Sequence, residues 1–93
     1  MAVAVCTIEL HIPAAGSLKA KRQVVQSVAG RIRSRCAAAV AETGHQDAWQ
    51  RATLEAAMVG SSRTVLAMQV ELLRRIVDDC GDAEVTAFAV DYL

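Results

Sequence analysis

Apolar residues at every second position near the start of the chain restrict the fold more than any other feature. The alternating set is Ala4, Cys6, Ile8, Leu10 and Ile12. A period of two places one side of an extended chain in a core and leaves the other side free, so residues 2–12 are predicted to form a half-buried β-strand. Pro13 then ends this strand.

Two later segments change to helical spacing. Ser17 is a typical N-cap residue, and the segment after it should be a helix that ends near Cys36. Its apolar stripe is Leu18, Val25, Val28 and Ile32. A second helix is expected between the start signal at residues 60–62 and the stop signal at Gly81. Its apolar arc is wide enough that part of it is expected to meet a second subunit.

Three further extended segments complete the pattern. Residues 37–43 and 48–59 are predicted to pair as an antiparallel hairpin around a turn from Gly44 to Asp47, although their alanines are poor strand formers. Residues 84–92 form the final strand, with Thr86, Phe88, Val90 and Tyr92 on one side. We find no repeat or linker, so residues 1–93 are expected to be a single domain.

The resulting order, βαββαβ, predicts an α+β ferredoxin-like fold: a four-stranded antiparallel sheet with both helices on one face. The other sheet face should then be uncovered. Its expected residues are Glu9, His11, Arg51, Thr53 and Glu55. Because it lacks paired aromatics, this face does not favour RNA binding by base stacking on the sheet.

Charge and cysteine content narrow the class of protein. Ten basic and ten acidic residues cancel, which predicts no general attraction to nucleic acid or membranes. Residues 1–51 nevertheless have a net charge of +4, from seven Lys/Arg and three Asp/Glu, and residues 52–93 have −4, from three and seven. The three cysteines lie far apart, which indicates reduced, buried thiols. With no signal peptide or membrane-spanning run, a cytoplasmic protein is expected.

The first helix is strongly basic and contains no acidic residue. Its cations are Lys19, Lys21, Arg22, Arg31, Arg33 and Arg35. Helical spacing puts Lys19, Arg22 and Arg33 on one flank, and Arg31 and Arg35 on the other. These residues either form a solvated face balanced by the acidic second half or bind the phosphates of a polyanion.

The segment from His45 to Arg51 holds the only tryptophan. Its candidate binding residues are His45, Gln46, Asp47, Trp49 and Arg51. Indole and guanidinium groups stack on flat partners, so a specific partner would be recognised here. Alternatively, His45 and Asp47 serve folding by holding the hairpin through side-chain to backbone hydrogen bonds.

Catalytic and metal sites have little support. Glu9, His11, His45 and Asp47 are metal or acid–base candidates, but they follow no ligand spacing and form no nucleophile–base set. We therefore expect no enzyme activity, no metal and no cofactor.

Three motifs point to a known family. They are ELHIP (residues 9–13), SLKAKR (residues 17–22) and AETGHQDAWQRA (residues 41–52). Together they resemble the YlxP-like family, domain of unknown function 503. The resemblance implies a small bacterial protein with a ferredoxin-like fold, often encoded near translation and ribosome-maturation genes, with no established activity. Gly44, Ala87 and Ala89 depart from the family's usual residues and make the uncovered sheet face less polar.

Two functions are therefore expected in competition. The first is a non-enzymatic module that binds RNA or a ribosomal particle through the basic first helix, with Trp49 and Arg51 as stacking contacts. The second is a homo-oligomeric interaction or scaffold domain without nucleic-acid binding.

Overall fold

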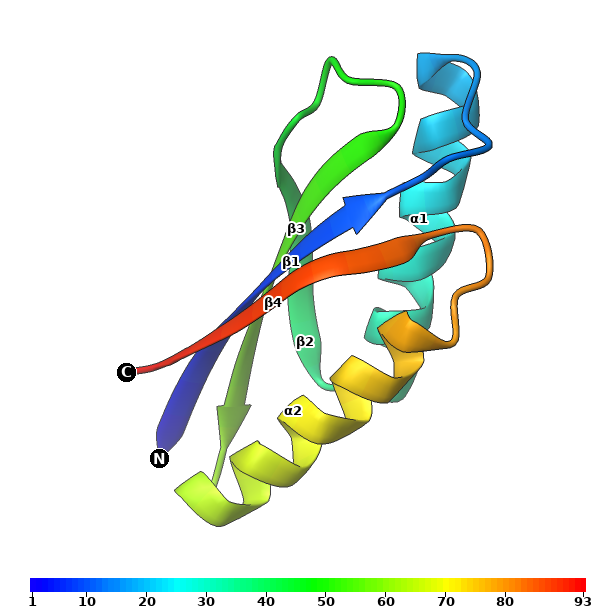
Figure 1. Cartoon of the computed structure of the whole chain (residues 1–93). Coiled ribbons are helices and arrows are strands. Elements are labelled where there is room, and N and C mark those ends of the chain that lie inside the picture. Colours follow the sequence, from blue (N-terminus) through cyan, green and yellow to red (C-terminus); the bar gives the residue numbers. More distant parts are fainter.

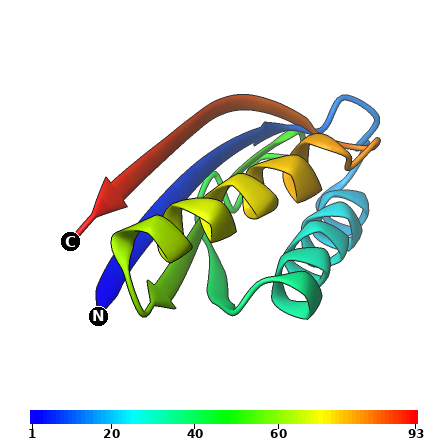
Figure 2. The ribbon, with the colours of Figure 1, turned by 90° about the horizontal axis from the view of Figure 1, so that it is seen from below.

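One four-stranded sheet with two helices on the same face makes up the molecule (Figures 1 and 2). The computed structural model describes all of residues 1–93. In chain order the elements are β1 (Ala2–His11), α1 (Leu18–Arg35), β2 (Ala38–Gly44), β3 (Arg51–Gly60), α2 (Arg63–Asp78) and β4 (Glu84–Tyr92). The strand order is β2-β3-β1-β4, with every neighbouring pair antiparallel. The ferredoxin-like prediction is confirmed.

The core lies between the sheet and the helices, where the alternating residues predicted it. Ala4, Cys6, Ile8 and Leu10 of β1 are all buried, since β1 is a central strand covered by the helices. The helices contribute their own apolar stripes to the same core: Val25, Val28 and Ile32 from α1, and Leu66, Val70, Leu73, Ile76 and Val77 from α2.

Both helices begin at a serine cap. The Ser17 hydroxyl accepts a hydrogen bond from the Ala20 amide at 3.0 Å, and the Ser62 hydroxyl accepts one from the Val65 amide at 3.2 Å. Each cap satisfies one of the amides that a helix start leaves without a partner. Neither helix is both long and apolar enough to cross a membrane.

The hairpin differs from its predicted bounds. β3 begins at Arg51 rather than at residue 48, and residues 45–50, here called the hairpin loop, separate it from β2. His45 has a φ of 57°, and its carbonyl accepts a hydrogen bond from the Ala48 amide at 3.0 Å. This left-handed residue turns the chain away from β2 and delays the start of β3. The strand propensity of residues 48–50 is overruled by that local geometry.

The sheet face opposite the helices is uncovered, as predicted. In the β1–β3 register Glu9 is paired with Thr53 and His11 with Arg51, and Thr7 is paired with Glu55. The prediction for β4 is wrong at Thr86, because the β1–β4 register shifts at Glu9/Leu10 and leaves this threonine exposed.

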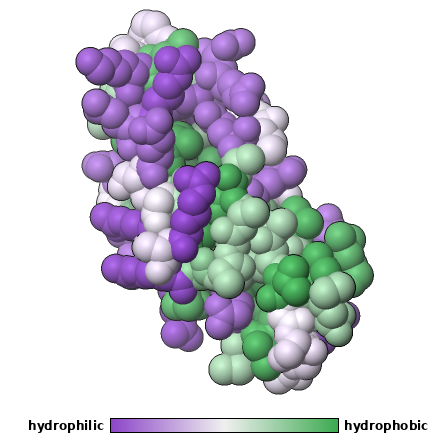
Figure 3. Space-filling view, turned by 180° about the vertical axis from the view of Figure 1, so that it is seen from behind, coloured by the Kyte–Doolittle hydropathy of each residue, from purple (hydrophilic) through white to green (hydrophobic).

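Apolar side chains remain exposed on α2, also as predicted from its wide apolar arc. Val65, Met68 and Leu72 are exposed, while Ile76, four residues after Leu72, is buried. Figure 3, which views the molecule from behind Figure 1, shows apolar surface gathered toward one end and polar surface toward the other.

Candidate functional site

A buried lysine organises the end of the molecule where the hairpin loop meets α1. The Lys21 side chain is 0% exposed. Its ammonium donates hydrogen bonds to Glu42 Oε2 at 2.8 Å and to the carbonyls of His45 at 2.9 Å and Gln46 at 3.1 Å. A longer contact of 3.4 Å reaches the Arg51 carbonyl. A lysine is buried only when such partners compensate for its lost hydration.

Lys21 was predicted to belong to the exposed basic surface of the first helix, and this prediction is wrong. It lies in the second turn of α1 on the side that faces the sheet, where Glu42 of β2 points toward it. Its function is to fix the main chain of the hairpin loop, and it is not available to a partner.

Glutamine side chains add further bonds around the hairpin loop. The Gln50 amide donates to the carbonyls of Pro13 at 3.1 Å and Ala15 at 3.2 Å. The Gln46 amide donates to the Glu42 carbonyl at 3.1 Å. Neither His45 nor Asp47 forms a side-chain to backbone bond, so their predicted role in holding the hairpin is wrong. The task falls to Lys21 and to the two glutamines.

The aromatic side chain of this segment is free for contact. Trp49 is 54% exposed. With His11, Ala48, Gln50 and Arg51 it lines a shallow surface depression of about 520 Å³. Because Lys21 binds the loop carbonyls of His45 and Gln46, and the Gln50 side chain ties the loop to the carbonyls of Pro13 and Ala15, the indole is presented from a fixed loop.

The remaining cations of α1 are exposed and lack acidic partners. They are Lys19, Arg22, Arg31, Arg33 and Arg35. None of them takes part in an ion pair; the acidic Glu42 nearby is bound to Lys21 instead. Their positive charge is therefore not neutralised locally.

The two flanks of α1 differ in surroundings. Arg22 and Arg33 line one groove of about 290 Å³ between α1 and β2, together with Gln26. The Arg33 guanidinium also donates to the Val40 carbonyl at 2.7 Å. On the other flank, Arg31 lies 3.8 Å from the Cys80 sulfur, in a neighbourhood that includes Asp79.

All three cysteines are buried and unpaired. Burial raises the pKa of each thiol above its ordinary value; near Cys80, Arg31 opposes this shift. The thiols are therefore held in their neutral form, which is the unreactive one.

The acidic and histidine candidates form two separate pairs. His11 Nδ1 lies 3.3 Å from Glu84 Oε2, and His45 Nε2 lies 4.0 Å from Glu9 Oε2. No group of three or more His, Cys, Asp or Glu side chains is close enough to hold a metal ion. Asp47 is exposed at the tip of the hairpin loop and does not join either pair.

The structural roles of Lys21, Arg33 and Gln50 were not predicted from the sequence. The only available signal was that Glu42 is a lone acidic residue on the side of β2 that should face the core. A lone inward carboxylate requires a cation, and this requirement could have selected Lys21.

Comparison with known proteins agrees with this fold and these motifs. The family model described as "Protein of unknown function (DUF503)" matches residues 3–90. The chain is also 33% identical over 72 residues to the uncharacterized protein YlxP of Bacillus subtilis (strain 168). The aligned region covers 77% of this chain and 78% of that protein. The predicted resemblance is confirmed, and the chain belongs to the DUF503 family.

Proposed function

We propose that this protein is a non-enzymatic module of the cytoplasm that binds RNA, free or in a ribosomal particle, through α1 and the hairpin loop. The observation that carries the proposal is the set of five exposed α1 cations with no carboxylate partner. A basic surface that the protein leaves unneutralised attracts a polyanion and releases counterions when it binds.

The β2 side of α1 is the better half of this surface. Arg22 and Arg33 are about 16 Å apart along the helix, and they line the same groove. That spacing suits contacts to phosphates that lie a few nucleotides apart on one strand. On the opposite flank Arg31 lines a small pocket with Asp82, whose negative charge repels phosphates. Glu42 also lines the groove of Arg22 and Arg33, but its carboxylate is paired with Lys21.

Trp49 supplies a contact to a base, which the phosphate contacts do not provide. Its exposed indole and the nearby Arg51 offer flat surfaces for an unpaired base, so binding should favour single-stranded RNA or a loop over a plain duplex. The indole lies in the hairpin loop rather than on the sheet, which distinguishes this mode from base stacking on strands.

The test is titration of a fluorescently labelled single-stranded RNA at two salt concentrations. The Lys19→Gln/Arg22→Gln variant should weaken binding at least about tenfold and lower the salt slope by about 1.4, because two phosphate contacts to a single strand are lost. Arg33 is left in place because it also bonds to β2. Arg31→Gln/Arg35→Gln removes the same charge from the other flank, and it should change affinity only about twofold.

Trp49→Ala should weaken binding by about 1 to 3 kcal/mol with no change in salt slope, because stacking does not depend on counterions. The proposal would be contradicted if the protein did not bind the RNA at low salt, or if its affinity did not change with salt. It would also be contradicted if both double variants lost the same amount of affinity.

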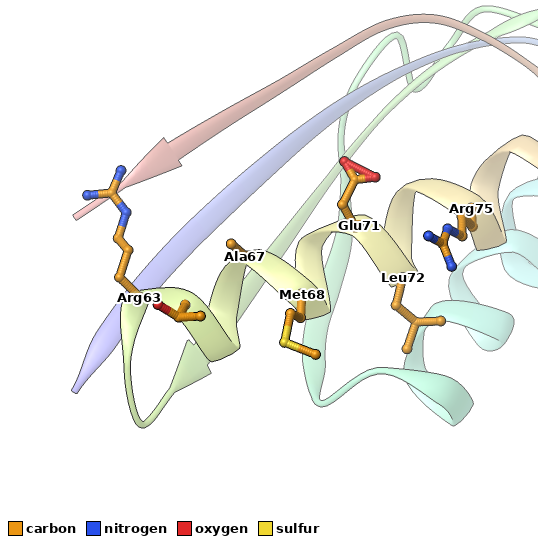
Figure 4. Close-up of a pocket in the computed structure, with 7 residues that line it drawn as sticks. Arg63, Ala67, Met68, Glu71, Leu72 and Arg75 are labelled. Carbon is orange, nitrogen blue, oxygen red and sulfur yellow. The ribbon is translucent and has the colours of Figure 1, made fainter.

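A second candidate function is self-association without nucleic-acid binding. The exposed apolar side chains Val65, Met68 and Leu72 of α2 favour it. Figure 4 shows Met68 and Leu72 pointing away from the sheet, while Arg63 and Glu71 extend on the side of β4. A mass measurement that finds only monomers at about 100 µM would exclude this candidate, since a dimer of micromolar affinity would then be saturated.

A further inference from the structure

The outer edge of β4 is a strand surface without a partner. β4 is the last strand in the sheet order and contains nine residues, with no lysine and no proline among them. Such an edge presents unpaired amides and carbonyls, and lysine and proline are among the features with which natural proteins protect it. Figures 1 and 2 show no other element alongside it.

The other edge of the sheet is protected differently. β2 has only seven residues, and the Arg33 side chain bonds to its Val40 carbonyl. Both edge strands have a register shift, at Glu42/Gly44 for β2 and opposite Glu9/Leu10 for β4, so this feature does not distinguish them. No side chain bonds to the main chain of β4 in the same way. The contrast indicates that β4 is the edge left open.

The register identifies which β4 groups point outward. The Leu93 amide donates to the Val3 carbonyl at 2.9 Å, so this pair exchanges bonds with β1. In an antiparallel ladder the bonded pairs alternate, so Asp91 and Ala89 also direct their main-chain groups toward β1. The amides and carbonyls of Phe88, Val90 and Tyr92 then face outward.

We propose that a second copy of this chain pairs its β4 antiparallel to this edge, about a two-fold axis at Val90, so that one sheet continues through both copies. In this register Phe88 of each copy lies opposite Tyr92 of the partner strand, which gives two equivalent aromatic pairs. The outward amides and carbonyls of both strands then form about six backbone hydrogen bonds. A shift by two residues in either direction would lose some of these pairs. The inference rests on self-association, the second candidate function, and places the contact on the β4 edge and not on the exposed apolar side chains of α2.

The side chains support the same arrangement. Phe88 and Tyr92 lie on the helix side of β4 but are only half-buried, with Arg74 at 4.2 Å over the first ring and Arg63 at 4.0 Å over the second. Opposed aromatic residues across two strands pack favourably, and the guanidinium groups would cover both pairs. On the other face Ala89 lies opposite Asp91, so the two Asp91 carboxylates are not directly opposed. A strand of unrelated sequence would not reproduce this reciprocal match.

The experiment combines mass measurement with directed cross-linking of the full chain. In wild type a dimer is expected at about 100 µM. The Ala89→Cys and Asp91→Cys variants are mixed and oxidised. The disulfide dimer of the two variants should form at least about tenfold faster than a disulfide dimer of either variant alone, because only the mixed dimer places two introduced thiols directly opposite each other. The three native thiols are buried and should not compete.

Val90→Pro provides the second arm. It removes an outward amide without removing a bond to β1, so it should abolish the dimer while the circular dichroism spectrum remains that of wild type. Met68→Glu, on the exposed apolar stripe of α2, is the matched control and should leave the dimer intact. A wild-type monomer contradicts self-association altogether; a dimer that survives Val90→Pro, or that fails to give the mixed disulfide, contradicts only the β4 edge.

Discussion

Lys21 determines the stability of the hairpin end more than any other single residue. Its ammonium is the common partner of Glu42 and of the carbonyls of the hairpin loop. Removing one member of a buried ion pair leaves the other without compensation, which costs more than the pair itself contributes.

Lys21→Met should therefore lower the free energy of unfolding by about 3 kcal/mol. Denaturant unfolding measures the change. Lys19→Met is the control: it removes an exposed charge from the same helix, and it should change stability by less than about 0.5 kcal/mol. Equal effects of the two substitutions would show that Lys21 is not the organising residue.

Sequence patterns alone could not reveal this role. In the segment Lys19-Ala20-Lys21-Arg22 three cations look alike, and the one that points inward is decided by the packing of α1 on β2. The partners of Lys21 are between 21 and 30 residues away along the chain. In contrast, Trp49 and Arg51 were predicted to be exposed contacts, and both are exposed.

At the scale of elements, the helices and most of each strand were predictable from their periodicities. The errors were Thr86, where the register of β4 shifts, and the start of β3, where a left-handed His45 and bonds from a distant lysine set the boundary. Alanine-rich β2 was correctly predicted as a strand even though alanine is a poor strand former, because its pairing with β3 outweighs local preference.

The junction between β3 and α2 depends on a glycine. A Cβ at Gly60 would lie 3.1 Å from Leu66 Cβ and 3.3 Å from the Leu66 backbone, whereas a Cβ at Gly30 in α1 would meet nothing within 4 Å. Gly60→Ala should therefore destabilise the protein by about 1 kcal/mol, since α2 must shift. Gly30→Ala should stabilise it by about 0.5 to 1 kcal/mol, because a helix interior favours alanine. Thermal melts of the two variants should move in opposite directions; a shift of both in one direction would contradict the packing at Gly60.

For the whole molecule, the three buried thiols make stability depend on alkaline pH. The pKa of each is raised by burial in the folded state. Above the ordinary thiol pKa the unfolded chain loses protons that the folded chain keeps, so unfolding releases protons and becomes easier as pH rises. The stabilisation is complete at neutral pH and is lost progressively through the raised values.

Melting temperatures measured from pH 7 to about pH 10 should therefore fall, and they should fall less in a variant with all three cysteines replaced by alanine. The two proteins differ only at the three cysteines, so the difference between the two slopes isolates the thiols. Identical slopes would mean that the thiols ionise as easily in the folded state as in the unfolded one.

The bonds from one ammonium to both Glu42 and the hairpin loop have an evolutionary consequence. In a relative that replaced only the lysine, the Glu42 carboxylate would lose its counter-charge and the hairpin loop would lose its hydrogen bonds. Such a change should therefore persist only with compensating changes at position 42 and in the loop. Across DUF503 sequences, positions 21 and 42 and the length of the turn are therefore expected to co-vary, whereas position 35 should vary independently of them.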